Sequence, residues 1–326
     1  MSNTFPIDVV VPWVFERPQD IDDQRIKAAL NTHVVYSEAH FRDYGLFELW
    51  VNLIKKNMPW VRKIFVLIDN KIPDGYELDE RVIFVKHSEY IFHKFLPTYN
   101  SNVIEMNIDL LDDLSEHFVL FNDDIFVLKK MRYTDFFTKD GLPKDVGAMI
   151  CRASENEFEK SVISNMLILN WNFEKKKSVK KNFAKYVSLK YGLRTVIKSI
   201  LSMPWTGFTG WEDTHLAIPY KKEEFINFHS QFPDIRENIG KHKYRHSDDV
   251  SHWLIRYIRL ARGEFSPSSI KKMGKLVFLS EIGTIKNEIS QLTIVCVNDD
   301  INSGETERFN ERCRELKELI CSFIET

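Results

Sequence analysis

The sequence has few cysteines, no long uncharged apolar run and no excess of charge of one sign. Its four cysteines form neither a CxxC pair nor the spacing of a metal site: Cys151, Cys296, Cys313 and Cys321. We therefore interpret them as thiols of the core or surface in a reducing compartment. The net charge of −2 gives no argument for a nucleic-acid partner, so any binding of a polyanion would be local.

Targeting and membrane-spanning patterns are also lacking. Residues 1–12 contain no basic segment followed by an apolar stretch and small cleavage residues, so a secretory signal is not predicted. No segment reaches the roughly 18 uncharged apolar residues that cross a bilayer. We expect a cytoplasmic protein whose only membrane option is peripheral association at the inner face of the cell membrane.

Strands alternate with helices along the first part of the chain. Continuous apolar runs predict buried strands at 7–13, 63–68, 82–85 and 117–121, and helical spacing predicts helices at 43–57 and 101–110. This order predicts an α/β domain with a mainly parallel sheet, in which ligands bind beyond the carboxyl ends of the strands. No fixed period recurs, so a solenoid or propeller is not expected.

The chain divides into three parts by composition. We expect residues 1–150 to form the α/β core, 151–208 to form a basic helical insertion, and 209–326 to complete the core. The last part contains three expected elements: a helix at 248–260, a strand at 292–297 and a charged helix at 305–324.

The insertion mixes basic and apolar residues at helical spacing. Its basic residues are Lys175, Lys176, Lys177, Lys180, Lys181, Lys185, Lys190, Arg194 and Lys198. One interpretation is a solvated helix face. The other is a surface for anionic lipid or for a lipid-linked glycan acceptor.

Two predicted strands end in the same tripeptide. Asn122-Asp123-Asp124 follows the strand at 117–121, and Asn298-Asp299-Asp300 follows the strand at 292–297. Adjacent carboxylates after a strand suit a hard divalent cation, although such pairs also cap helices and form turns. In a parallel sheet both ends could face the same crevice.

Other polar residues are further candidates. His215 has the chemistry of a general base, and a histidine beside tryptophan can equally be structural. Arg245 and His246 precede a predicted helix that Ser247 could cap, which suits either a phosphate site or solvent-facing charges. Asp8 lies inside a buried strand and must contact either a ligand or a protein donor. No Walker loop, GxGxxG, HExxH or GxSxG motif occurs, so phosphate would be held by another device.

Four blocks in order resemble the Stealth family of capsular polysaccharide phosphotransferases. The first is Ile7-Asp8-Val9-Val10-Val11-Pro12-Trp13-Val14. The second comprises Arg42-Asp43-Tyr44-Gly45-Leu46, Pro59-Trp60-Val61-Arg62-Lys63-Ile64, Asp69-Asn70-Lys71-Ile72-Pro73, Leu96-Pro97-Thr98-Tyr99-Asn100-Ser101, Ile104-Glu105, Leu114-Ser115-Glu116-His117-Phe118 and Phe121-Asn122-Asp123-Asp124. The third comprises His215-Leu216-Ala217-Ile218-Pro219 and Tyr244-Arg245-His246-Ser247-Asp248-Asp249, and the fourth is Val295-Cys296-Val297-Asn298-Asp299. Val11-Pro12 replaces the usual Tyr-Thr of the first block.

The resemblance implies a Rossmann-like fold similar to nucleotide-sugar glycosyltransferases, and a reaction that transfers a sugar 1-phosphate from a nucleotide sugar to a glycan hydroxyl. It implies Mg²⁺ or Mn²⁺ on Asp124, Asn298 and Asp299, and it places His215, Arg245, Glu105 and Asp124 in catalysis. It further implies substrate contacts for Asp8, Arg42, Asn100, Asn122 and His246.

Two other functions remain open at this point. An ordinary metal-dependent glycosyltransferase would use the same donor but release UDP. A non-catalytic glycan-binding or membrane-surface scaffold would explain the aromatic content and the basic insertion, but it gives no reason for two Asn-Asp-Asp ends.

Overall fold

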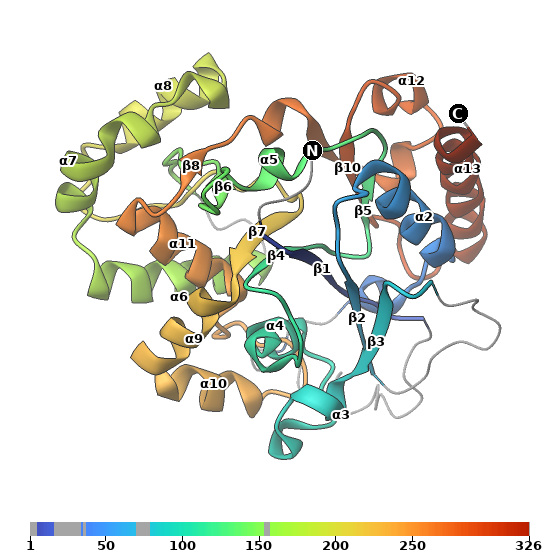
Figure 1. The fold of residues 1–326 in the computed structure, drawn as a ribbon, viewed down its shortest axis with the longest axis horizontal. Coiled ribbons are helices and arrows are strands. Elements are labelled where there is room, and N and C mark those ends of the chain that lie inside the picture. Colours follow the sequence, from blue (N-terminus) through green and yellow to red (C-terminus); the bar gives the residue numbers. More distant parts are fainter. Residues whose placement is uncertain (1–4, 16–33, 35–36, 70–78, 153–156, 326) are drawn as a thin grey trace.

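A five-stranded sheet in the order β3-β2-β1-β4-β7 lies at the centre of the molecule (Figure 1). The computed structural model describes residues 5–15, 34, 37–69, 79–152 and 157–325. The strands are β1 (Ile7–Pro12), β2 (Ile64–Ile68), β3 (Val82–Lys86), β4 (His117–Leu120) and β7 (Ile218–Lys221). The first four run parallel, and β7 pairs antiparallel with β4. The predicted α/β fold with a mainly parallel sheet is confirmed.

The sheet is buried on both faces because its central strands are continuous apolar runs. Along β1, Val9 and Val11 point into one core cluster and Val10 points into the other. The first cluster is covered by α2 (Phe47–Asn57) and α13 (Thr306–Glu325). The second is covered by α4 (Ser101–Met106), α6 (Glu157–Asn172), α9 (Lys222–Gln231) and α11 (His252–Arg262). The result is a sheet between two helical layers.

A second, separate sheet contains β5 (Ile125–Val127), the strand that follows β4 in the chain. It has the order β5-β10-β9, with β10 (Ile294–Asn298) and β9 (Gly274–Phe278). The strand β10 runs antiparallel to β5 and parallel to β9. The strand expected at 292–297 therefore exists but belongs to this smaller sheet. A third, two-stranded sheet joins β6 (Lys144–Asp145) to β8 (Ser266–Pro267).

Several predicted helices begin or end elsewhere. The helix expected at 43–57 begins at Phe47, and the one expected at 101–110 ends at Met106 and is followed by a 3-10 turn at Ile108–Leu110. The helix expected at 248–260 begins at His252 with Ser251 as its N-cap residue, so the prediction that Ser247 caps it was wrong. The stretch 70–73 of the second sequence block lies outside the described residues.

Three α-helices and a 3-10 turn at Leu189–Tyr191 lie in the described part of the stretch between β6 and β7. The α-helices are α6, α7 (Lys175–Tyr186) and α8 (Leu193–Ser202). Figure 1 shows α7 and α8 at one end of the long axis and α13 at the other. After β7, α9 is followed by α10 (Pro233–Gly240). None of the helices in the described ranges is long and apolar enough to cross a bilayer.

Candidate active site

The two Asn-Asp-Asp segments meet at the carboxyl edge of the central sheet. Residues 122–124 form the turn from β4 into β5, and β10 pairs with β5 so that Cys296 lies opposite Ile125. The backbone N–H of Val297 donates to the carbonyl oxygen of Asp124 across 2.8 Å. Because the two strands are antiparallel, the end of β10 reaches the start of β5. The sequence predicted this meeting, but it assigned it to one parallel sheet.

Carboxylates crowd this meeting point. Burial, followed by the negative charges of Asp124 and Asp43, raises the pKa of Asp123 to about 8. Burial also raises the pKa of Asp124 to about 6 and raises that of Asp43. One oxygen of Asp124, Oδ2, accepts a hydrogen bond from Cys296 Sγ at 3.2 Å, and the other, Oδ1, is buried with no hydrogen-bond partner. Nearby positive charge would therefore stabilise the ionised form of these carboxylates.

Arg42 and Tyr44 hold the end of β10 against this cluster. Arg42 Nη2 lies 2.5 Å from Asp299 Oδ2, and the guanidinium carbon lies 4.5 Å from the centre of the Phe309 ring. Tyr44 donates its hydroxyl to the carbonyl oxygen of Val297 at 2.9 Å. Burial, then the charges of Asp124 and Asp299, raise the pKa of Tyr44 well above its ordinary value. The two acidic segments thus act on one shared neighbour.

Arg245 is a second arginine that interacts with this cluster. Its Nε donates to Ser101 Oγ, on the first residue of α4, at 2.9 Å. Burial lowers the pKa of Arg245, and the charges of Glu105, Asp123 and Asp249 oppose that shift. The guanidinium therefore lies among three carboxyl groups, one of which belongs to the first Asn-Asp-Asp segment.

Glu105 is a buried carboxyl group between Arg245 and α11. Burial raises its pKa to about 7, and the positive charge of Arg245 opposes the rise. His252 Nε2 lies 3.5 Å from Glu105 Oε2. Burial lowers the pKa of His252 to about 3, so the imidazole is neutral and does not hold Glu105 ionised. Glu105 can consequently exchange a proton near neutral pH.

Asn100 shapes the loop that carries Arg245. Its Nδ2 donates to Asp249 Oδ2 at 2.7 Å and to the carbonyl oxygens of His242 and Tyr244 at 3.2 and 3.3 Å. Its Oδ1 accepts from the N–H of Asn102 at 3.0 Å. Because protein groups use both ends of the amide, the substrate contact expected for Asn100 is corrected to a positioning role.

Asp249 orders the rest of this loop, which the sequence had assigned to a helix start. Its Oδ2 accepts the backbone N–H of His246 at 2.9 Å, and its Oδ1 lies 2.6 Å from His242 Nδ1. The rings of His242 and His246 stack with their centres 4.3 Å apart. Arg245 therefore reaches the site from a loop braced by one buried carboxylate, and not from a helix N-terminus.

Asp8 is the clearest correction among the predicted site residues. It is fully buried near the start of β1, whereas the site lies beyond the strand's other end. Arg62 binds both of its oxygens, at 2.9 and 2.7 Å, and the backbone N–H groups of Lys63 and Ser115 donate to them at 3.1 and 2.7 Å. Protein donors satisfy this carboxylate, which excludes the expected substrate contact.

His215 emerges at the same edge of the sheet as Asn122. The residue pair Ile218–Leu120 joins the start of β7 to the end of β4, and His215 comes just before that start. Its backbone has a φ of +49°, a left-handed conformation that is uncommon outside glycine. Its ring centre lies 6.2 Å from that of Trp253 on α11. The structure therefore places His215 at the carboxyl edge of the central sheet, next to the amino end of α11.

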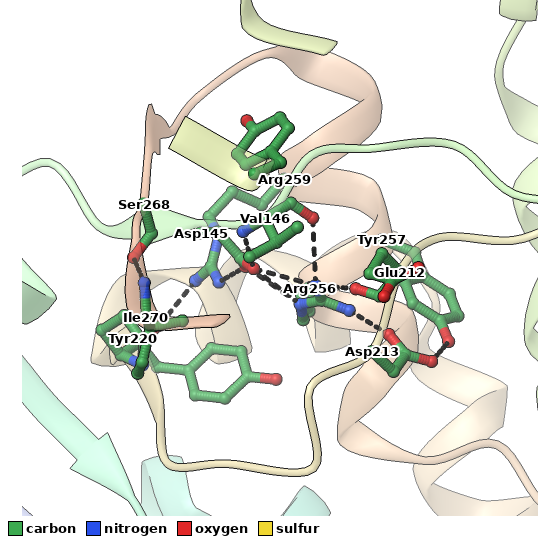
Figure 2. Close-up of polar contacts among 12 residues, drawn as sticks. Asp145, Val146, Glu212, Asp213, Tyr220, Arg256, Tyr257, Arg259, Ser268 and Ile270 are labelled. Carbon is green, nitrogen blue, oxygen red and sulfur yellow. Dashed lines mark hydrogen bonds and ion pairs between the residues drawn. The ribbon is translucent and has the colours of Figure 1, made fainter. Parts of the chain in front are cut away.

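A buried ionic network fixes the segment before His215 (Figure 2). Asp213 accepts hydrogen bonds from Arg256 and from the Tyr257 hydroxyl, the latter at 2.9 Å. Arg256 and Arg259 both reach Asp145, at 2.8 and 2.7 Å. Charges in such a network are costly to leave unpaired. It ties α11 to the strand β6 and to the His215 segment.

The oxygen donors at the meeting point fit a hard cation. The unpartnered Oδ1 of Asp124 offers one ligand, and Asn298 is exposed beside it at the end of β10. Asp299 already pairs with Arg42, so a cation there would share its carboxylate. In the described part of the chain, no three His, Cys, Asp or Glu side chains form a ready-made metal cluster. Asn122 is exposed in the same turn.

Sequence reasoning gave no role to two residues of this cluster: Asp43 and Tyr44. Both lie in a sequence block that was recognised, and both directly follow Arg42. The signal that could have identified them is the charged and aromatic run Arg42-Asp43-Tyr44 just before the apolar helix α2. It was missed because the helix was expected to start at Asp43.

Comparison with known proteins places the chain among glycan phosphotransferases. Residues 40–145 match the family model described as Stealth protein CR2, conserved region 2. The capsular polysaccharide phosphotransferase WcwK of Streptococcus pneumoniae is 37% identical over 92% of this chain and 91% of its own length. The exopolysaccharide phosphotransferase cps2G of Lactiplantibacillus plantarum is 31% identical over 96% and 93%.

A solved structure of the galactosyltransferase LgtC with donor and acceptor sugar analogs has a TM-score of 0.39 and 9% sequence identity, covering 97% of this chain and 95% of that one. Family membership rests on the relatives of higher identity, which align with nearly the whole chain. The chain belongs to the Stealth family of capsular polysaccharide phosphotransferases.

Proposed function

We propose that the chain transfers a hexose 1-phosphate from a UDP-sugar to a hydroxyl of a glycan acceptor in bacterial surface polysaccharide synthesis, in the cytoplasm. The acceptor oxygen attacks the β-phosphorus, and the bond from that phosphorus to the bridging oxygen breaks. UMP leaves with the electron pair, the sugar keeps one phosphate, and the acceptor proton passes to a base. The product is a phosphodiester.

The charge distribution at the meeting point carries this proposal. A diphosphate placed beside Asp123, Asp124 and Asp299 would be repelled unless cations lie between them. The chain supplies Arg42 at Asp299 and Arg245 near Asp123. Mg²⁺ or Mn²⁺ held by Asp124, Asn298 and Asp299 would supply the remaining positive charge against the diphosphate. Phosphoryl transfer depends mainly on such positioning and charge stabilisation.

The other predicted site residues are assigned roles from their positions relative to the two Asn-Asp-Asp segments. Arg245 would neutralise the equatorial phosphoryl oxygens, because its guanidinium already lies beside Asp123 and Glu105. His215 at the carboxyl edge of the sheet and Glu105, whose pKa is about 7, are the two candidates for the base that takes the acceptor proton. Asn122 and His246 are left as contacts for donor or acceptor.

The rival is a glycosyltransferase that attacks the anomeric carbon and releases UDP. It needs cations mainly on the leaving diphosphate, so a second arginine that interacts with Asp123 and Glu105 would be harder to explain. The direct test is incubation with a panel of UDP-sugars, Mg²⁺ and a glycan acceptor, followed by chromatography of the nucleotide. UMP supports the proposal, and UDP or no turnover with any donor contradicts it.

A further inference from the structure

The helices α6, α7 and α8 expose an unusual amount of apolar surface. The side chains with the largest exposure there are Trp171 at 73%, Leu189 at 71%, Leu201 at 69%, Leu193 at 68% and Trp205 at 59%. Large apolar residues exposed singly are ordinary, but a group within one short stretch marks an interaction surface. The reaction proposed above uses none of these residues.

The exposed apolar residues of α8 share one face of the helix. They are Leu193, Ile197, Ile200 and Leu201, whose spacing matches the helical repeat. The opposite face, with Val196 and Ser199, is buried against the protein. Arg194 and Lys198 are exposed next to the apolar face. One face of α8 thus packs against the protein. The other face is apolar and exposed, and no described part of the chain covers it.

The helices α6 and α7, which precede α8 in the chain, also carry exposed apolar or basic residues. Along α6, Ile163, Leu167 and Trp171 recur every four residues and are all exposed. On α7, the buried face carries Ser178 and Asn182, whereas the exposed residues include Phe183 and four lysines. The four lysines are Lys176, Lys177, Lys180 and Lys181. We call the exposed apolar residues of α6 and α8 with Trp205, together with these four lysines, Arg194 and Lys198, the helical patch.

The positive charge of the segment 173–206 favours an anionic partner. Between Phe173 and Thr206 there are nine basic residues and one acidic residue, Glu174, in a chain whose net charge is −2. Basic residues around exposed leucine, isoleucine and tryptophan match an anionic bilayer, where apolar side chains enter the interface and lysines meet headgroups. A second copy of the same patch would be repelled by like charge.

We propose that the helical patch is a docking surface for an anionic lipid bilayer. Its location at the end of the molecule away from α13 would leave the rest of the chain clear of the membrane (Figure 1). On α6, Ser161 Oγ donates to the carbonyl oxygen of Asp249 at 3.1 Å, so the helix that carries the apolar stripe begins at the Arg245 loop.

Vesicle flotation with the purified full chain tests this inference. The parent should bind vesicles of phosphatidylglycerol and phosphatidylcholine and should bind weakly to phosphatidylcholine alone. Replacing Lys176, Lys180 and Lys181 together by Gln should weaken binding to the anionic vesicles by roughly 100-fold, since each basic residue near such a surface contributes about fivefold. Raised salt should have a similar effect on the parent.

Matched variants separate the patch from general charge and apolarity. Replacing the exposed Lys129, Lys130 and Lys317 by Gln removes the same charge elsewhere and should change binding by less than about threefold. Leu193→Ser with Ile197→Ser and Leu201→Ser should abolish binding, whereas Phe92→Ser with Ile226→Ser and Phe278→Ser should not. Circular dichroism checks that each variant is folded.

Three results would overturn the inference. The first is a parent that fails to bind anionic vesicles, and the second is an equal loss of vesicle binding in the two lysine variants. The third result is a dimer of the parent that dissociates only in the α8 variant. The last would identify a second copy as the partner. Binding is measured without donor or acceptor, so failure here would leave the proposed reaction untouched.

Discussion

Val297 donates its backbone N–H to the carbonyl oxygen of Asp124 across 2.8 Å, and this bond joins two acidic segments that lie far apart in the sequence. The first segment ends β4 of the central sheet, and the second ends β10 of the smaller sheet. The site is therefore completed only when the last third of the chain folds against the first. This dependence explains why neither segment alone identifies the chemistry.

Replacing Asp124 by Asn should abolish turnover without unfolding the chain. The change keeps the shape of the side chain but removes the negative charge that a divalent ion requires, so the rate should fall roughly 100-fold or more. Thermal unfolding gives a second readout. Mg²⁺ should raise the Tm of the parent and leave that of the variant unchanged, because only an ion bound to the folded state stabilises it.

The exposed Asp112 provides the matched control for this substitution. Asp112→Asn should keep both the turnover and the Mg²⁺-dependent rise in Tm. Full turnover of the parent in excess EDTA would remove the metal assignment, whatever the variants do.

Replacing Arg245 by Lys should lower turnover by about 10- to 100-fold. The guanidinium is planar and can span two phosphoryl oxygens while its Nε holds Ser101, whereas an ammonium is a point charge. Loss of one charge-assisted hydrogen bond at the transition state, about 1.5–3 kcal/mol, accounts for this range. Arg132→Lys, at a position that is 83% exposed, is the control. A normal turnover rate in the Arg245 variant would mean that Arg245 is a charged loop residue with no part in catalysis.

Replacing Asp123 by Asn should stabilise the fold at alkaline pH. Burial raises the pKa of Asp123 to about 8, whereas the unfolded chain has an ordinary aspartate. Between these two values the folded state binds more protons than the unfolded state, so the free energy of unfolding falls as the pH rises. The neutral amide avoids this loss.

Urea unfolding without divalent ions measures that effect. The gain of the Asp123 variant over the parent should be small near about pH 4 and largest above about pH 8. A gain that is the same at both pH values would mean that ionisation of Asp123 does not limit the stability of the parent.

Replacing Asp213 by Asn should destabilise the chain by about 3–5 kcal/mol, because Arg256 then keeps a buried charge with one partner fewer. Turnover well below the Tm should also fall, since the segment that carries His215 loses its anchor. Glu223→Gln removes an exposed ion pair with Lys221 and should cost less than about 1 kcal/mol. Similar losses in both variants would contradict the account of the network.

The sequence was informative where burial dictates the pattern. β1, β2 and β4 are short, mainly apolar runs, and the sequence located all three strands. Local pattern could not reveal β7, a four-residue strand containing proline, or its antiparallel pairing with β4. That pairing brings His215 to the edge, so the placement of His215 needed the tertiary structure.

Polar residues were the harder part of the prediction. Asp8 and Asn100 are buried and occur in recognised blocks, and both turned out to be saturated by protein groups. A buried polar residue in a sequence is compatible with either role, because ligand and protein donors satisfy it equally well. Asp249, which orders the Arg245 loop, carries no local signal that distinguishes it from the neighbouring exposed Asp248.

The nucleotide that leaves during turnover tests the central claim most directly. Attack at the β-phosphorus breaks the bond between the two phosphates, so the proposed reaction must release UMP and leave phosphorus in the new linkage. Chromatography of the nucleotide and phosphorus NMR of the glycan measure these outcomes independently. UMP with a phosphodiester signal is the predicted result, and UDP with a phosphorus-free glycan would contradict the proposal.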